Sequence, residues 1–280
     1  MIDPLAPQLR RLRRPGFANA SELAARHGAL GVYVRNAVLD DEDGGGELHG
    51  YFATDDTLLA AAWFGVRGNL VALGDGDAAV DGFAAALSTI ASPWRIALAP
   101  KRLVAALQRR ESRPAIVQRT QVYYECRADD LASRAEPAHA VRIAERADVD
   151  ALCEAALALN EADLHVPRER VHRGWLEKSV RRRLREGRTW VIGPVGHPTA
   201  KLDVGSRGRA GVVLEGVFTV AEERGRGLAT ALVLGVARSL IEEHGVVCLH
   251  VDAENAAARR AYARAGMRVA GECGLLLRDP

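Results

Sequence analysis

The sequence predicts an α+β protein of two domains, in which strands and helices alternate along the chain. Length is the first reason: 280 residues, 48% of them hydrophobic, are long for one domain and fit two. The second reason is that short apolar runs typical of strands are separated by segments with helical periodicity. The third is the stretch Leu214–Thr230, where a strand, a glycine-rich turn and a helix follow one another directly.

Composition argues against several classes of partner. The formal net charge is +2, so we expect no nucleic-acid binding. The longest apolar run, Leu58–Val66, is too short to span a bilayer, and the N-terminus lacks the apolar core of a signal peptide. We therefore expect a cytoplasmic protein without membrane contact. The cysteines are far apart in the sequence and predict neither a disulfide framework nor a metal site: Cys126, Cys153, Cys248 and Cys273.

We place the domain boundary in the polar segment 128–139, which gives domains 1–137 and 138–280. Expected elements of the first domain are, in order, a basic helix near 5–14, a helix Ser21–Gly28, a strand Gly31–Leu39, an acidic turn Asp40–Gly46, strands Gly50–Thr54, Leu58–Phe64 and Asn69–Leu73, a helix Asp77–Ile90, a strand Arg95–Ala99, a helix that starts at Pro100 and a strand Gln118–Arg127.

The second domain repeats a similar order of elements, so we interpret the first as a divergent copy of it. Expected elements are a strand Val141–Ala144, a helix Ala147–Leu159, a link Asn160–Val166, a helix Pro167–Gly187, strands Trp190–Val195 and Ala200–Val204, a turn Ser206–Gly211, a central strand Val212–Val220, a helix Leu228–His244, a strand Val246–Asp252, a helix Ala256–Ala265 and a closing hairpin of Met267–Ala270 and Gly274–Arg278. The charge run Arg181–Arg183 is interpreted as a solvated helix face in preference to a site for a phosphorylated partner.

The turn Arg224-Gly225-Arg226-Gly227 predicts an anion site. It directly precedes a helix, whose first-turn N–H groups lack partners within the helix and whose dipole favours negative charge. Glycines let a ligand approach the backbone closely. Arg224 and Arg226 add charge that can pair with phosphate oxygens. We interpret the turn as a pyrophosphate site.

This turn also resembles a family signature. Arg224-x-x-Gly227-x-Ala229 is similar to the Arg/Gln-x-x-Gly-x-Gly/Ala motif of the GNAT superfamily of acyl-CoA-dependent N-acetyltransferases. The motif gains weight because it lies between a strand and a helix, as that family requires.

A second motif follows about 30 residues later. Asn255-x-x-Ala258-x-x-x-Tyr262-x-x-x-Gly266-Met267 is similar to the family's Asn-x-x-Ala-x-x-x-Tyr-x-x-x-Gly-Phe pattern, with Met where Phe is usual. The resemblance covers most of 138–280. It implies the GNAT fold, a mixed and mostly antiparallel sheet flanked by helices, preceded in 1–137 by a second α/β domain of divergent GNAT-like topology.

The resemblance implies a transfer of an acetyl group from acetyl-CoA to a primary amine, by direct attack in a ternary complex and without a metal. The acceptor, a small molecule or a protein, is not defined by the sequence, and the protein is expected to be a monomer or homodimer. In the family the pantetheine arm pairs with the central strand and the pyrophosphate lies on the first turn of the next helix. Implied contacts are Val217, Phe218, Thr219, Val220, Arg224, Gly225, Arg226, Gly227, Leu228, Ala229, Thr230 and Asn255.

Two residues are catalytic candidates. Glu215 stands alone in an apolar strand, and relatives often use a strand carboxylate as general base through water; alternatively its side chain faces a solvated cleft or an arginine. Tyr262 is implied as the proton donor to the leaving thiolate; alternatively its ring only packs the helix. Asn255 is a helix cap, with or without a contact to pantetheine.

The acceptor wall is assigned to Glu161, Asp163 and His165, whose acidic members suit a cationic amine. The alternative is that they are solvated loop residues. In the first domain the comparable turn, Gly74–Asp77, carries acidic residues that would repel phosphate, so we expect no CoA site there. A second hypothesis for the whole chain is a CoA-binding regulatory or scaffolding module without turnover.

Overall fold

The chain forms two compact units that each draw on segments far apart in the sequence. The computed structural model describes residues 7–13, 16–40, 46–66, 68–74, 79–90, 94–111, 115–132 and 134–278. Unit 1 contains Met1–Tyr123, Gly208–Ala210 and Ala270–Pro280, and unit 2 contains Tyr124–Arg207 and Gly211–Val269. The expected boundary at 137–138 falls inside unit 2. The division into domains 1–137 and 138–280 stays a prediction.

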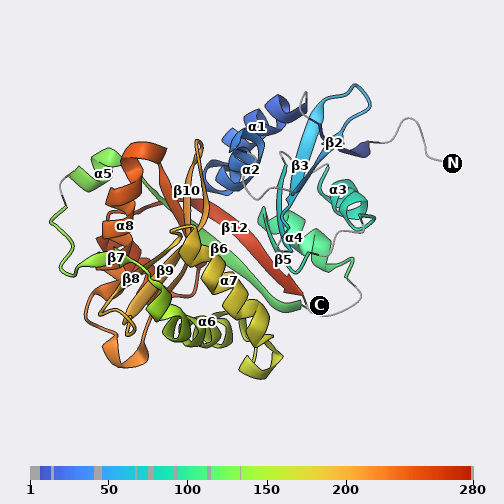
Figure 1. Ribbon diagram of the computed structural model, residues 1–280. Coiled ribbons are helices and arrows are strands. Elements are labelled where there is room, and N and C mark those ends of the chain that lie inside the picture. The colour runs from blue at the N-terminus through green and yellow to red at the C-terminus, as the bar shows by residue number, and fades with distance from the viewer. Residues whose placement is uncertain are drawn as a thin grey trace. The chain divides into compact units, whose positions relative to one another are not determined.

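Unit 1 is built on a sheet with the strand order β1-β2-β3-β4-β5-β12-β6 (Figure 1). Its strands are β1 (Gln8–Arg11), β2 (Glu47–Phe52), β3 (Leu58–Phe64), β4 (Asn69–Gly74), β5 (Ile96–Ala99), β6 (Ala115–Cys126) and β12 (Arg268–Arg278), and its helices are α1 (Phe17–Ala25), α2 (Gly28–Asp40), α3 (Val80–Leu87) and α4 (Lys101–Gln108). Strands β4 and β5 are parallel, whereas β1–β2, β2–β3, β3–β4 and β5–β12 are antiparallel.

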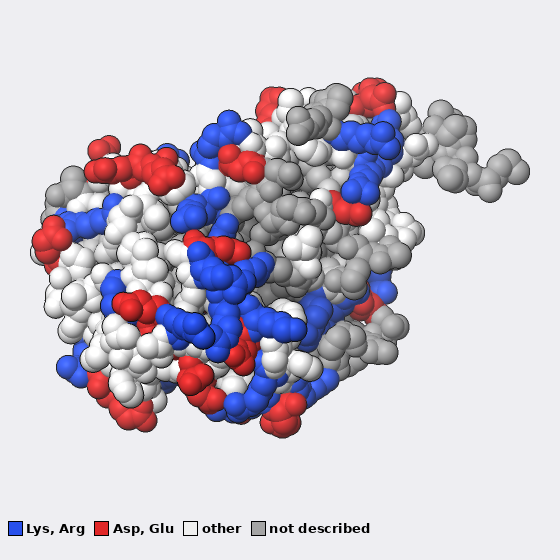
Figure 2. All heavy atoms as spheres, in the orientation of Figure 1, with Lys and Arg blue, Asp and Glu red and all other residues white. Residues whose placement is uncertain are grey.

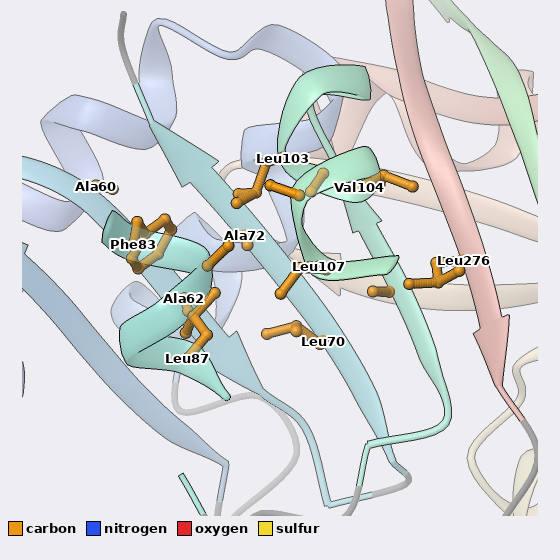
Figure 3. Packing of buried hydrophobic residues seen from close by; sticks show 14 of the residues in the cluster. Ala60, Ala62, Leu70, Ala72, Phe83, Leu87, Leu103, Val104, Leu107 and Leu276 are labelled. Atoms are coloured by element: carbon orange, nitrogen blue, oxygen red, sulfur yellow. The ribbon is translucent and has the colours of Figure 1, made fainter. Parts of the chain in front are cut away.

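The core of unit 1 includes the last strand of the chain. Figure 3 shows Phe83 of α3 and Leu103 of α4 packed with strand residues such as Leu70. Leu276 of β12 belongs to the same cluster and is completely buried. Strand β12 is the last strand of the second half of the sequence, yet it contributes an apolar side chain to the core of unit 1, which is built mainly from the first half.

Unit 2 has a sheet with the order β11-β10-β9-β8-β7. Its elements are α5 (Ala128–Ala132), β7 (Val141–Ile143), η2 (Arg146–Asp148), α6 (Val149–Leu164), η3 (Arg168–Arg170), α7 (Arg173–Arg185), β8 (Thr189–Ile192), β9 (Ala200–Gly208), β10 (Gly211–Thr219), η4 (Ala221–Glu223), α8 (Leu228–His244), β11 (Val247–Asp252) and α9 (Ala256–Arg264). Strands β10 and β11 are parallel, and β7–β8 and β8–β9 are antiparallel.

Helices cover both faces of this sheet. Val141 lies opposite Ile192 and Arg142 opposite Val191, so Val141 and Val191 point to different faces. Helix α8 lies against Val141, because a Cβ on its Gly235 would come 2.7 Å from Val141 Cγ2. Val191 instead packs in a cluster with residues of α6 and α7. Helix α8 therefore covers one face, and α6 with α7 covers the other.

The structure corrects two predictions in the first half. Residues 8–11, predicted as part of a basic helix, form β1, which pairs with β2. Gly31–Leu39, predicted as a strand, lies inside α2. Helix α2 packs closely on α1, since a Cβ at Gly31 would come 1.8 Å from the Ala24 carbonyl oxygen. In the predicted turns Asp40–Gly46 and Gly74–Asp77, residues 41–45 and 75–77 lie outside the described part of the chain.

Three connections in the second half also differ from prediction. The link Asn160–Val166 is largely helical, because α6 continues to Leu164. The turn Ser206–Gly211 is shorter, since β9 extends to Gly208 and β10 begins at Gly211. The closing hairpin is wrong: β12 is one continuous strand, in which Gly271 takes a φ of 155° without reversing the chain.

Candidate active site

Strand β10 changes character along its length. Its first four residues, 211–214, are buried, and Val212, Val213 and Leu214 pair in parallel with β11. Among the described residues no such pairing continues beyond Leu214, although β11 runs on to Asp252. Gly216 has a φ of 57°, a left-handed conformation that interrupts the regular strand. The later residues are only half-buried, and they include the implied pantetheine contacts Val217, Phe218 and Thr219; the fourth, Val220, directly follows the strand and is also half-buried.

The turn after β10 has the geometry of an anion site. Gly225 and Gly227 take φ values of 78° and 77°, and a Cβ built on either would meet nothing within 4 Å. Gly227 is the N-cap of α8, and no side chain caps this helix. The backbone N–H groups of the first turn, at Leu228, Ala229 and Thr230, lack partners within the helix and lie at the positive end of its dipole. This arrangement fits a pyrophosphate.

The two arginines of the turn differ in their surroundings. Arg224 donates from Nε to the Thr219 carbonyl oxygen at 3.3 Å, which ties the turn to the end of β10. Arg226 is ion-paired with Glu223, an interaction between exposed or half-buried side chains. Glu223 thus offsets the positive charge of Arg226, which was predicted to pair with phosphate oxygens. The remaining groups that could bind an anion are Arg224, the backbone of the glycine turn and the N-terminus of α8.

Tyr262 lies in α9 and is 5% exposed. Its ring meets Tyr124 edge-on, with the ring centroids 5.9 Å apart. Burial, with smaller contributions from Asp163 and Tyr124, raises the pKa of the Tyr262 hydroxyl above its ordinary value of 10.0. The hydroxyl therefore keeps its proton at neutral pH. Its proton-donor role stays a prediction, while the packing role is visible in these contacts.

Asn255 caps α9, as expected from the sequence. Its side-chain oxygen accepts a hydrogen bond from the Ala258 N–H at 3.0 Å.

The predicted acceptor residues lie at the end of α6. Glu161 and Asp163 are in its last turns, and His165 is its C-cap with a φ of 53°. Glu161 is ion-paired with Arg168 at 3.2 Å, so its charge is shared. Asp163 contributes, after burial, to the raised pKa of Tyr262, so its charge acts on the catalytic candidate. Glu161 is tied to a neighbouring arginine.

Glu215 extends across the neighbouring strand β9. A Cβ on Gly205 would come 2.1 Å from Glu215 Cδ, so the carboxyl group occupies the space that a side chain at 205 would fill. Gly205 therefore makes room for Glu215 on the sheet face. The catalytic role of Glu215 stays a prediction.

A buried charged cluster beside this strand was missed by the sequence prediction. Lys201 Nζ lies 2.7 Å from Asp203 Oδ2, and both side chains are less than 10% exposed. Burial opposes ionisation of Asp203, but Lys201 and Arg183 outweigh it and lower its pKa. A Cβ at Gly216 would come 2.9 Å from Lys201 Nζ. Lys201 therefore lies directly against the backbone of the left-handed residue Gly216 in β10. The sequence does contain a signal for this cluster: Lys201 and Asp203 are two positions apart and alternate with apolar residues at the start of the strand, so both side chains lie on the same face.

Helix α7 carries several basic residues, among them Arg181, Arg182 and Arg183. Figure 2 shows Lys and Arg side chains gathered over it, with acidic side chains between them. Arg181 pairs with Glu177 at 2.7 Å and Arg183 with Asp203 at 3.4 Å. Residues 181–183 are half-buried, and these pairings balance the charges of Arg181 and Arg183 locally; the expected solvated face is therefore only partly exposed.

The comparisons with known proteins concern the fold. Residues 207–274, which hold most of β10, α8, β11, α9 and β12, match a family model described as FR47-like protein. No curated protein matches the chain. A GCN5-related N-acetyltransferase from Sphaerobacter thermophilus is similar over 99% of this chain and 96% of its own, with 17% identity and a TM-score of 0.60.

Two other solved structures extend the likeness. A Drosophila protein is similar over 97% of this chain and 99% of its own, with 12% identity and a TM-score of 0.63. A tandem GNAT protein from the clavulanic acid biosynthesis pathway is similar over 97% and 98%, with 15% identity and a TM-score of 0.53. At these identities the likeness concerns the fold. The protein has the fold of the GNAT acetyltransferases, as the two motifs predicted.

Two further properties concern the described residues alone. None of their helices is both long enough and apolar enough to cross a membrane. No three of their His, Cys, Asp and Glu side chains gather as they would around a metal ion.

Proposed function

We propose that the protein is an N-acetyltransferase that uses acetyl-CoA and a primary amine in a ternary complex. One observation carries the proposal. Strand β10 leaves its pairing with β11 after Leu214 and leads, through a turn with two left-handed glycines, to the uncapped N-terminus of α8. A strand whose pairing with β11 stops at Leu214, followed by an anion site, suits a ligand with an amide-bearing arm and a pyrophosphate.

Different segments of the chain bind the two parts of the coenzyme. Backbone groups of 217–220 pair with the pantetheine arm as an added strand would. The N–H groups from Gly225 to Thr230 hold the pyrophosphate, and Arg224 adds charge at its edge. When bound, acetyl-CoA supplies an acetyl group activated as a thioester.

Two side chains of unit 2 carry the proton transfers of the reaction, one as a base and one as an acid. Glu215 accepts the proton of the attacking amine through water, because an amine must be neutral to act as a nucleophile. Tyr262 holds a proton that it donates at the leaving sulfur. Asp163, whose charge also acts on Tyr262, favours an acceptor that arrives as a cation.

The anion site is tested by Gly227→Glu, with binding of CoA measured by calorimetry. A glutamate there places a negative charge in the open space before α8, so we expect at least a tenfold weaker affinity. Gly245→Glu is the matched control: it lies at the other end of the same helix, also has a left-handed φ, and also faces open space. Equal affinities in the two variants would contradict the assignment.

Turnover is tested by following CoA release from acetyl-CoA over a panel of amines. Release with any amine, absent without one, supports the transferase. Tight CoA binding with no release over small amines, amino acids, aminoglycosides and peptides would favour the regulatory or scaffolding module.

A further inference from the structure

The segment between the two predicted domains is docked along α8. Arg238 of α8 binds Glu136 at 2.6 Å and donates to the Arg134 carbonyl oxygen at 2.5 Å. Gly235, on the same helix, leaves room for Pro137, which lies 3.5 Å from where a Cβ would be. The segment 134–141 therefore follows α8 along the surface, and we use the name strap for these residues.

The strap reaches the candidate anion site at His139. Its Nε2 lies 3.3 Å from the carbonyl oxygen of Arg226, a residue 87 positions later in the chain. A carbonyl oxygen can only accept, so Nε2 carries the proton and donates it. Arg226 lies between the two left-handed glycines of the turn, Gly225 and Gly227.

This hydrogen bond acts on one peptide unit of the turn. The Arg226 carbonyl and the Gly227 N–H belong to the same planar trans peptide, so they point in opposite directions. A donor that holds the carbonyl on one side fixes the direction of the N–H on the other. It also polarises the peptide, which makes that N–H a stronger donor. This peptide joins Arg226 to Gly227, and because glycine has no Cβ, the Gly227 side restricts its rotation little when nothing holds it.

We propose that His139 is a positioning residue of the coenzyme site: it holds the 226–227 peptide so that the Gly227 N–H is directed at the pyrophosphate. This inference rests on the proposed function, because it assigns the anion to CoA. It makes the strap a part of the binding site, although the strap contains none of the residues that the sequence motifs identify.

The test compares His139→Ala and His139→Gln with the unaltered protein, using calorimetry with CoA and with pantetheine, which has no phosphate. The alanine removes the donor, and we expect a Kd for CoA about five to ten times higher. The glutamine amide can replace Nε2–H, so its Kd should lie within about twofold of the original. Binding of pantetheine should be equal in all three proteins. In the amine assay the alanine should raise KM for acetyl-CoA and leave kcat unchanged.

The control is His197→Ala, an exposed histidine in the turn between β8 and β9. It should bind CoA normally. The inference is overturned if His139→Ala binds CoA normally, if its affinities for CoA and pantetheine fall together, or if the glutamine is no better than the alanine. Failure of the unaltered protein to bind CoA overturns the proposed function as well, and this is seen before any variant is compared.

Discussion

Burial and the neighbouring Asp163 keep the hydroxyl of Tyr262 protonated far above neutral pH. We expect Tyr262→Phe to lower kcat about tenfold to a hundredfold, because the leaving sulfur loses its proton donor while the ring still packs against Tyr124. Affinity for CoA should be unchanged. The control is Tyr51→Phe, which removes a buried hydroxyl from unit 1.

The pH dependence of Tyr262 follows from the raised pKa. The folded protein holds this proton more tightly than the unfolded chain, so the contribution to stability is present below about pH 10 and is lost at higher pH. A general acid with this pKa imposes no fall in kcat below pH 10. A fall in kcat near pH 8 that disappears in Tyr262→Phe would contradict the assignment.

The cysteines offer a second test at the residue scale. Burial raises the pKa of the thiols of Cys126, Cys248 and Cys273 to about 12, and each is nearly or fully enclosed. Cys153 is only half-buried, although its pKa is also raised. Because reactivity needs both access and the thiolate, we expect a disulfide reagent at pH 8 to modify Cys153 alone and slowly. All four thiols should react in denaturant. Rapid reaction of two or more in the folded protein would contradict this burial.

At the scale of elements, a buried ion pair ties the start of α6 to two neighbouring connections. Arg142 on β7 contacts both carboxylate oxygens of Asp148, at 2.7 and 3.0 Å. Asp148 also accepts from the N–H groups of Glu145 and Gly196. Burial opposes ionisation of Asp148, but these hydrogen bonds outweigh it and lower its pKa.

We expect Asp148→Asn to lower the free energy of unfolding by about 3 kcal/mol, because it leaves Arg142 without its charged partner. A folded-state pKa below the unfolded value stabilises the protein above about pH 4, and this contribution is lost as the pH falls through the folded value. Urea unfolding should therefore show a smaller difference between the variant and the original protein at pH 3 than at pH 7. Asp150→Asn, an exposed carboxylate in the same helix, is the control.

The helices and strands differ in how well they could be predicted from the sequence. Strands and helices that bury only one face were predicted well. An example is α8, where apolar residues recur every four positions and a glycine ends the helix. Helix α2 was missed because it is buried on several sides, so its apolar residues show no helical period. Its β-branched residues then favoured a strand, and tertiary packing overrode that preference.

The candidate site divides in the same way. The anion turn and the cap Asn255 were predictable, because local backbone chemistry determines both. Contacts that depend on residues far apart in sequence were not, such as Glu215 over Gly205 or His139 at Arg226. No local pattern marks such a pair, since each partner alone resembles an ordinary strand or loop residue.

At the scale of the whole molecule, the order of segments along the chain does not match the two compact units. Leu276 is completely buried in unit 1, among residues of the first half. We expect Leu276→Ala to lower the free energy of unfolding by about 2–5 kcal/mol through loss of packing. Val269→Ala, on the same strand but 60% exposed, should change it by less than about 0.5 kcal/mol. Chemical denaturation of both variants checks this, and similar losses would contradict the buried placement of β12.

The place of β12 has a consequence for synthesis on the ribosome. Gly274 pairs with Ala99, so β5 must wait for a partner that is translated about 175 residues later. At typical elongation rates that wait lasts roughly 10–35 s, during which an apolar strand edge of the nascent first unit has no partner from β12. We expect stalled chains that end before residue 268 to be held by chaperones, and longer chains that expose β12 outside the ribosomal tunnel to be released. Vectorial synthesis thus makes completion of the first unit one of the last steps in the folding of this protein.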